Sequence, residues 1–196
     1  MNFSQMNQRQ ILRAWLRTTW IGWVLGVPCI VVLALLGEAL GIGGVQFLVG
    51  AGMGAGIGYM QSRALRGVLD KPAKWFSANF IGLALPFLVT DIAKALEWNL
   101  PYSLYVCVAI GGLLVGAWQT LLLHARFDKA AWWIIASLVG WSAAAGMAAL
   151  AQMQSLRGLV GALAYLAIVA AGGAVLGLVT GAAWAWLLKP KLAMNT

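Results

Sequence analysis

Few side chains in this sequence are of the types that perform chemistry, and they do not form a familiar catalytic pattern. His124 is the single histidine, and the two cysteines, Cys29 and Cys107, lack the spacing of a metal-binding motif. The sequence contains no G-x-S-x-G, H-E-x-x-H or P-loop pattern. Because one histidine and two separated cysteines provide no credible triad, we expect a protein that is not an enzyme and has no metal site.

These three residues still have alternative roles. His124 opens the segment HARFDKAAWW, where basic residues surround it, so we interpret it as a solvated side chain. The alternative is an axial ligand of haem or of a chlorophyll. Cys29 and Cys107 fall inside apolar runs, and we expect two buried thiols or, alternatively, a disulfide. No cofactor is required by the sequence; a bound lipid or pigment stays open.

Charged side chains inside apolar runs are the next candidates, because such residues often mark ion or proton pathways. They are Glu38, Asp91, Lys94 and Glu97. Asp91 follows Trp75 by sixteen residues, or about 24 Å along a helix, which places it near the outer membrane interface. We interpret the group as a self-neutralised interfacial pair of charges. The alternatives are a proton or ion site at Asp91 and a docking surface for a partner.

Six uncharged polar residues recur at constant spacings in the apolar runs. Three follow a glycine by three residues and three follow a tryptophan by four; they are Gln61, Gln119 and Thr180, and Thr19, Asn79 and Ser137. A polar group in hydrocarbon needs a hydrogen-bond partner. We therefore expect hydrogen bonds between neighbouring helices. The alternative is a polar ring that contacts a solute or a lipid headgroup.

The elements that carry these residues are predicted to be transmembrane helices. Of the 196 residues, 62% are hydrophobic and only 9% are charged, which is too few charges for a soluble surface. About 20 apolar residues cross a bilayer as a helix. The sequence predicts an all-α single transmembrane domain over 1–196, with six spans: 14–37, 42–62, 74–97, 102–123, 130–151 and 161–188.

An internal repeat organises these spans. The 27 residues from Gly58 align without a gap with those from Gly116, pairing Gln61 with Gln119, Asp70 with Asp128 and Trp75 with Trp133. Shorter similar fragments begin at Trp15 and Gly172. We therefore expect three tandem helical hairpins, roughly 14–62, 74–123 and 132–188, with pseudo-threefold symmetry about the membrane normal.

The second helix of each predicted hairpin carries glycines four residues apart, which lie on one helix face. They are Gly50, Gly54 and Gly58; Gly112 and Gly116; and Gly173, Gly177 and Gly181. Small residues at this spacing allow close helix packing in a membrane. The alternative is that they make room for a flat cofactor or a pore.

Basic residues predict the orientation. Eleven of the thirteen Lys and Arg fall on one side of a six-helix topology: Arg9, Arg13, Arg17, Arg63, Arg66, Lys71, Lys74, Arg126, Lys129, Lys189 and Lys191. The positive-inside rule places that side, with both termini, in the cytoplasm. We interpret the net charge of +8 as topology and attraction to anionic lipid, without nucleic-acid binding.

Tryptophans are expected at the membrane interface and in the bundle interior. Trp15, Trp75, Trp132 and Trp133 fit a cytoplasmic aromatic belt. Trp141 lies deeper in its span, where it would fill space or pack against a bound ring.

The repeated pattern G-x-x-x-G-x-x-Q, a short basic loop, then W and a glycine seven residues later, resembles uncharacterised small polytopic membrane proteins of bacteria, cyanobacteria and Chloroflexota among them. The resemblance covers most of the chain and implies architecture only. We expect the protein in a bacterial inner, intracytoplasmic or thylakoid membrane. We expect a non-catalytic accessory or structural subunit that packs with membrane lipids and with other integral membrane subunits or copies of itself. The alternative is a small-solute or ion transporter that uses the polar ring and Asp91.

Overall fold

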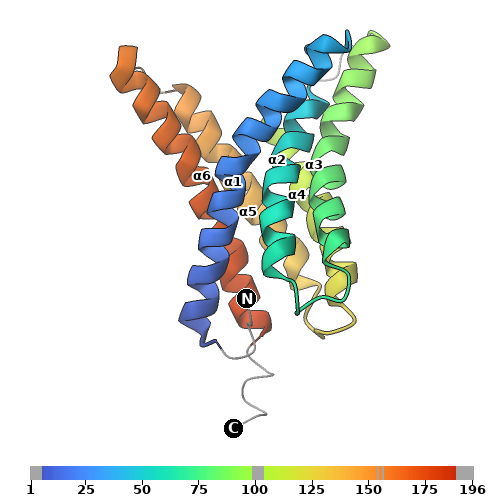
Figure 1. Ribbon diagram of the computed structural model, residues 1–196, viewed down its shortest axis with the longest axis vertical. Coiled ribbons are helices and arrows are strands. Elements are labelled where there is room, and N and C mark those ends of the chain that lie inside the picture. The colour runs from blue at the N-terminus through green and yellow to red at the C-terminus, as the bar shows by residue number, and fades with distance from the viewer. Residues whose placement is uncertain (1–5, 99–103, 154, 156, 189–196) are drawn as a thin grey trace.

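The protein is described from a computed structural model that covers residues 6–98, 104–153, 155 and 157–188 (Figure 1). This part of the chain folds into six α-helices, and five of them are long and apolar enough to cross a membrane. The fold therefore fits an all-α membrane protein. The helices are α1 (Gln8–Ala39), α2 (Phe47–Ala64), α3 (Pro72–Ala95), α4 (Leu104–Leu123), α5 (Trp132–Met153) and α6 (Gly158–Leu187).

Each predicted span coincides with one helix, and local chemistry explains where the helices begin. α1 starts before its apolar run, at a capping box in which Asn7 and Gln10 exchange two hydrogen bonds of 2.9 Å. α3 starts at Pro72, a position that proline tolerates because the first helical N–H has no intrahelical partner. Both helices therefore have start signals in the sequence itself.

The helix α2 is the one not apolar enough to count as a span on its own composition. Every second residue from Gly50 to Gly58 is glycine, and most of its residues are buried between other helices. These glycines, which lower the hydropathy of the helix, lie against α1 and α3.

The six helices form a ring. Each packs against its neighbours in the sequence, and α1 packs against α6 to close the circle. Figure 1 shows the helices gathered at one end and spread at the other, where α5 and α6 lean away from α1 to α4. We call the gathered end the basic half, since it holds Arg9, Arg13, Arg63, Lys71 and Arg126, and the spread end the open half. Lys189 and Lys191 lie outside the described residues.

The predicted glycine faces lie at helix contacts, each against the helix that follows it around the ring. A Cβ atom at Gly54 would lie 2.4 Å from the carbonyl oxygen of Asn79, and one at Gly116 would lie 2.7 Å from the Cβ of Ser137. A Cβ at Gly177 would lie 3.0 Å from Leu16 of α1. These approaches leave no space for a larger residue. The remaining members make contacts of the same kind: Gly50 and Gly58 with α3, Gly112 with α5, and Gly173 and Gly181 with α1.

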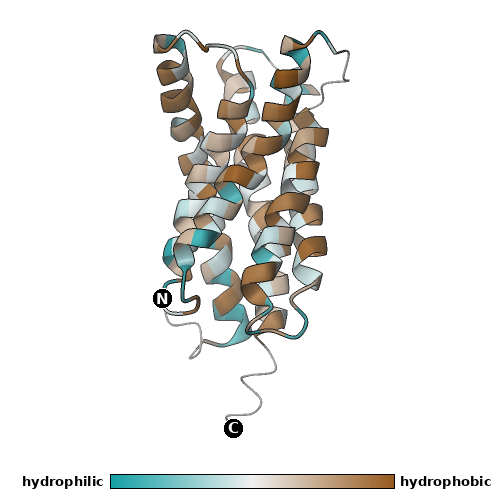
Figure 2. Cartoon of the chain, turned by 90° about the vertical axis from the view of Figure 1, so that its right-hand side faces the viewer, coloured by the Kyte–Doolittle hydropathy of each residue, from teal (hydrophilic) through white to brown (hydrophobic). Residues whose placement is uncertain are grey.

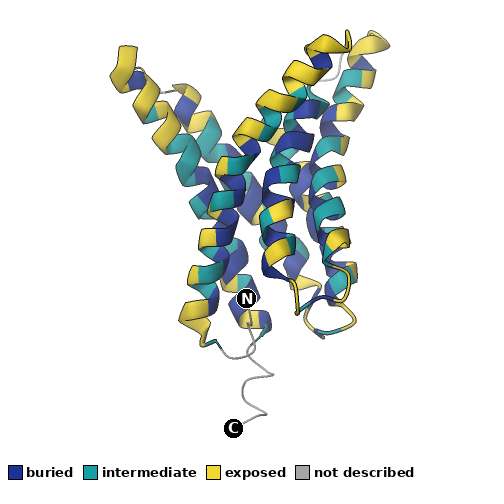
Figure 3. Cartoon of the chain, viewed as in Figure 1, coloured by how far each residue is buried: buried dark blue, intermediate teal, exposed yellow. Residues whose placement is uncertain are grey.

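The hydropathy pattern agrees with membrane embedding. Figure 2 shows many hydrophobic residues along the middle of the helices, and Figure 3 shows exposed positions on the outer faces of the ring and at the tips of the open half. Many exposed side chains are large aliphatic residues, among them Val31, Leu35, Leu121 and Leu163. Such a surface fits a lipid environment.

Candidate functional site

Four tryptophans fill the centre of the basic half. Trp15, Trp75, Trp133 and Trp184 are at most 1% exposed, and every pair of rings has centroids between 5.3 and 6.2 Å apart. Most pairs meet edge-on or tilted, the arrangements that the aromatic quadrupole favours. The prediction of an interfacial belt is therefore wrong for Trp15, Trp75 and Trp133. It fits Trp132, which is 59% exposed.

Three of these indoles donate a hydrogen bond to a polar residue of the neighbouring glycine-rich helix. Trp75 Nε1 donates to Gln61 Oε1 at 3.0 Å, and Trp133 Nε1 donates to Gln119 Oε1 at 2.7 Å. At the place where the ring closes, Trp15 Nε1 donates to Thr180 Oγ1 at 2.9 Å. The indole needs such a partner when it is buried, so the polar residues fix the position of the aromatic cluster.

The other three polar residues of the predicted ring also bond within the protein. Gln61 Nε2 donates to Thr19 Oγ1 at 3.1 Å, Asn79 Nδ2 donates to the Trp75 carbonyl at 3.0 Å, and Ser137 Oγ donates to the Gly112 carbonyl at 2.7 Å. All six polar side chains are buried. The structure therefore places them at contacts between and within helices. The Nε2 atom of Gln119 is buried and has no hydrogen-bond partner among the described residues.

A second layer lies on the tryptophan cluster. It contains Trp23 and Trp141, whose ring centroids are 6.1 Å apart, together with Leu83. Buried Ile57, Val115 and Leu176 of the glycine-rich helices complete it. With the cluster below, this layer fills the axis of the bundle from the basic end to its middle.

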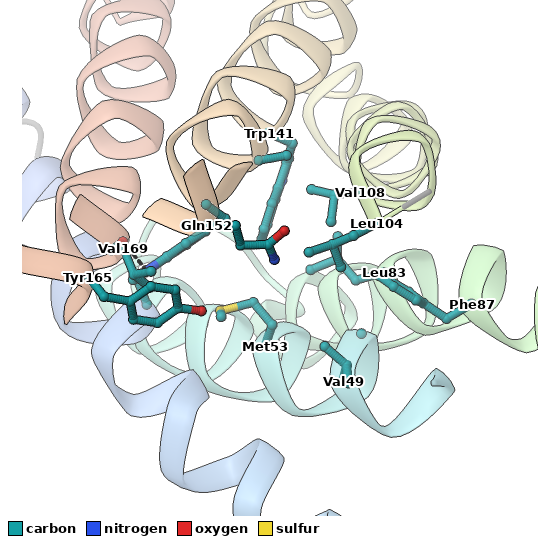
Figure 4. Close-up of a pocket in the computed structure, with 14 residues that line it drawn as sticks. Val49, Met53, Leu83, Phe87, Leu104, Val108, Trp141, Gln152, Tyr165 and Val169 are labelled. Carbon is teal, nitrogen blue, oxygen red and sulfur yellow. Dashed lines mark hydrogen bonds between the residues drawn. The ribbon is translucent and has the colours of Figure 1, made fainter. Parts of the chain in front are cut away.

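Above the second layer, in the open half, the axis holds a cavity of about 140 Å³ (Figure 4). Trp23 and Trp141 contribute to its walls, and Met53 and Phe87 line it from α2 and α3. All six helices contribute, and the lining carries no charged side chain: Trp23, Val49, Gly50, Met53, Leu83, Phe87, Leu104, Val108, Trp141, Ala145, Ala148, Gln152, Tyr165 and Val169. The cavity is therefore suited to an apolar molecule.

Two polar groups border this cavity. Figure 4 shows the amide of Gln152 and the hydroxyl of Tyr165 directed toward it from α5 and α6. Tyr165 is 40% exposed and Gln152 is also exposed, so both lie where the cavity meets the surroundings. They could orient a ligand that has one polar group at its end.

Two tryptophans of α1 join it to α6 beside the cavity. Trp23 Nε1 donates to the Val169 carbonyl at 2.9 Å, and Trp20 Nε1 donates to the Ala170 carbonyl at 3.1 Å. These carbonyls are consecutive on α6, next to the glycines where α1 crosses it. The pair of bonds therefore holds the α1–α6 contact that closes the ring.

Of the outer charged residues, Asp91 contacts the start of another helix. Asp91 Oδ2 accepts a hydrogen bond of 2.8 Å from the backbone N–H of Phe47, the first residue of α2. A carboxylate at a helix N-terminus is stabilised by the exposed N–H groups and the helix dipole. The Glu38 carboxylate lies against Gly43 in the loop that follows α1, and the Lys94 and Glu97 side chains are exposed at the end of α3.

The remaining candidates lie apart from each other. His124 is exposed in the loop after α4, Cys29 is half-buried in α1 and Cys107 is buried in α4. Both cysteines are free thiols. Within the described residues, no group of three or more His, Cys, Asp or Glu is placed to hold a metal ion.

The sequence reasoning missed most of the cavity. It singled out Trp141 as a residue that fills space or packs on a ring, but it did not single out Trp23, Gln152 or Tyr165. A signal is present in α5, where the run SAAAGMAAL replaces the larger residues of the corresponding part of α3, ALPFLVTDI. Small side chains on one helix only leave space beside it.

No family model, no curated protein and no solved structure matches the chain, so the resemblance to small bacterial polytopic proteins rests on the repeated motif alone.

Proposed function

We propose that the protein is a non-catalytic integral membrane protein, an accessory subunit whose open half binds the apolar part of a lipid or a pigment. The observation that carries this proposal is the axial cavity, which is lined by all six helices and stops at Trp23 and Trp141. A pocket built of apolar walls with a few polar groups is typical of a small-molecule site.

The size of the cavity limits what it accepts. An engineered cavity of about 150 Å³ with apolar walls takes up benzene, so a space of about 140 Å³ suits a six-carbon ring or the end of a hydrocarbon chain. The rest of the ligand would extend past Gln152 and Tyr165. A carbonyl or hydroxyl group on the ligand would hydrogen-bond to either side chain.

We also propose that the chain consists of three repeats with pseudo-threefold symmetry. The support is the recurrent hydrogen bond from a buried indole to a polar side chain three residues after a glycine, seen at Trp75, Trp133 and Trp15. In space the paired helices are α2 with α3, α4 with α5, and α6 with α1. This pairing favours a repeat unit of a glycine-rich helix followed by a tryptophan-led one, shifted by one helix from the predicted hairpins.

The proposed location is a bacterial inner, intracytoplasmic or thylakoid membrane with the basic half facing the cytoplasm. The support is the distribution of charge: the described loops of the basic half carry Arg66, Lys71, Arg126 and Lys129, while Arg157 lies at the open half. The cavity would then open toward the outer leaflet.

A transporter that uses the polar ring and Asp91 is the alternative, and the geometry favours it less. The six ring residues bond to the protein itself, four tryptophans occupy the axis beside them, and the Asp91 carboxylate caps α2. Reconstituted alone in liposomes, the protein should move neither ions nor small solutes. A measurable flux would contradict the proposal.

The cavity can be tested with a photoreactive lipid. A diazirine on the terminal carbons of a palmitoyl chain should crosslink to cavity residues such as Met53 and Tyr165, which peptide mass spectrometry would identify. The variant Ala148→Phe should fill the cavity and abolish this crosslink. The control Ala136→Phe, on the outer face between α5 and α6, should keep it. Equal labelling of both variants would contradict the proposal, as would labelling confined to outer faces.

A further inference from the structure

A groove at the basic end lies apart from the axial cavity and combines charge with an apolar wall. It has a volume of about 230 Å³ and lies where the start of α3 meets the end of α4. Its charged residues come from the two loops and the first turn of α3, and its apolar residues come from α4 and the same two loops. The residues that line it are Leu69, Asp70, Lys71, Lys74, Leu121, Leu122, Ala125 and Arg126.

One ion pair shapes the groove. The Arg126 guanidinium donates to the Asp70 carboxylate and to the Val68 carbonyl, which ties the loop after α4 to the loop after α2. This ion pair uses the single negative charge of the lining. Arg126 therefore holds the two loops together, and its positive charge is balanced by Asp70.

Two cations of the groove have no counter-ion. Lys71 and Lys74 are exposed, and neither ammonium group makes a hydrogen bond or an ion pair in the described part of the chain. With Arg126 balanced by Asp70, the lining carries two uncompensated positive charges. Lys74 lies in the first turn of α3 and Lys71 directly precedes the helix. The helix dipole adds a partial positive charge at this end.

The other wall of the groove is apolar and faces outward. Leu121 is 73% exposed and lies beside Leu122 in the last turn of α4. In a membrane-spanning helix this position is next to the lipid chains, one turn below the basic loop. This arrangement of cations above an exposed aliphatic wall is complementary to a phospholipid. The cations match its phosphate, and the aliphatic wall matches its acyl chain.

We propose that this groove is a binding site for an anionic phospholipid, in which Lys71 and Lys74 hold the phosphate and Leu121 and Leu122 contact the acyl chain. A second groove, between α5 and α6, is an uncharged counterpart for comparison. It has Trp132 and Trp186 among aliphatic and alanine side chains, and Lys129 lies 5.0 Å from the Trp186 ring centroid. Its lining contains no charged residue, so it should not select for an anionic headgroup.

The test measures lipid affinity by native mass spectrometry of the full chain released from detergent micelles. The probes are phosphatidylglycerol and phosphatidylcholine with identical acyl chains. The wild type should prefer phosphatidylglycerol. The variant Lys71→Gln/Lys74→Gln should weaken its binding about 30-fold, since each basic residue near an anionic surface contributes about 5-fold. The control Arg9→Gln/Arg13→Gln removes the same charge from exposed residues of α1 and should change the affinity little.

Three results would overturn the proposal. Equal affinity for phosphatidylglycerol and phosphatidylcholine would mean that the groove does not distinguish lipids by headgroup charge. Equal loss in the control variant would mean that the whole basic half attracts anions without a specific site. Displacement of phosphatidylglycerol by millimolar inorganic phosphate would assign the groove to a free anion. Because the variants do not touch the axial cavity, crosslinking of the photoreactive lipid there should be unaffected by them.

Discussion

The two halves of the bundle are built from the same six helices but are packed differently along the axis. In the basic half, Trp15, Trp75, Trp133 and Trp184 fill the axis completely. In the open half, the helices spread and leave a cavity above Trp23 and Trp141. The difference lies in the side chains that face the axis: large indoles in one half, and alanines such as Ala145 and Ala148 in the other.

This difference shows how rigidity and capacity can coexist in one small membrane protein. Indoles that are packed together and donate hydrogen bonds to residues such as Gln61 and Gln119 have one favoured arrangement. Small residues on spread helices have few contacts that fix their arrangement, so we expect the space between them to accept ligands of different shape. We therefore expect the basic half to be the more rigid part of the bundle and the open half to be the more adaptable part.

The largest effect is expected from truncating one indole of the scaffold. Trp133→Ala removes a fully buried ring and leaves Gln119 without its indole donor, so the free energy of unfolding should fall by about 3 kcal/mol or more. Trp132→Ala, the adjacent and exposed tryptophan, should cost less than about 1 kcal/mol. Titration with sodium dodecyl sulfate in mixed micelles measures both. A similar loss of unfolding free energy in the two variants would contradict the assignment of Trp133 to the core and Trp132 to the interface.

A smaller contrast is expected between glycines of the two halves. Gly116→Ala would place its Cβ 2.7 Å from Ser137, so α4 and α5 must separate, at a cost of about 1–3 kcal/mol. Gly146→Ala in the open half meets nothing within 4 Å and should stabilise α5 by up to about 1 kcal/mol. The same micelle titration compares them. If both substitutions destabilised the protein equally, the open half would be as tightly packed as the basic half.

The hydrogen bond from Trp23 of α1 to α6, where the ring closes, should have an intermediate effect. Trp23→Phe keeps an aromatic ring at the cavity but removes the hydrogen bond to the Val169 carbonyl, which should cost about 1 kcal/mol. It should also widen the distance between spin labels on the open ends of α1 and α6, measured by double electron–electron resonance. Leu113→Phe, at an exposed position of α4, is the control. An unchanged distance distribution would show that the spread of the open half does not depend on this bond.

The smallest effect is expected at Asp91. Asp91→Asn keeps a side-chain acceptor for the Phe47 N–H but removes the negative charge at the start of α2, so stability should fall by about 0.3–1 kcal/mol. Proton leak through reconstituted liposomes should not change. A change in leak with unaltered stability would reverse this interpretation and support an ion pathway through the open half.

Much of the fold follows from the sequence. Six apolar runs of suitable length predict six helices, and the structure has a helix at each of them. The repeat aligns Asp70 with Asp128, but it does not predict that Asp70 pairs with Arg126 across two loops. Such a contact between loops is not encoded in the spacing of either loop alone.

Two adjacent tryptophans show what the sequence does not predict about burial. Trp132 and Trp133 are adjacent, and composition assigns both to the membrane interface, but one is exposed and the other is in the core. Helical geometry places neighbours on different faces, and the hydropathy of α5 is too uniform to show which face points inward. Only the position of α4, with Gln119 facing Trp133, decides the matter.

By itself, the sequence determined the class of the protein, the order of its helices and the residues that allow close packing. Those properties depend on composition and on spacings of three or four residues, which act within one helix. The tertiary structure decided what distant residues do together: Trp15 bonds to Thr180, Asp91 caps α2, and all six helices share one cavity. These features depend on how tilted helices meet in space, because a membrane gives every helix the same apolar surroundings and only side-chain fit selects its neighbours.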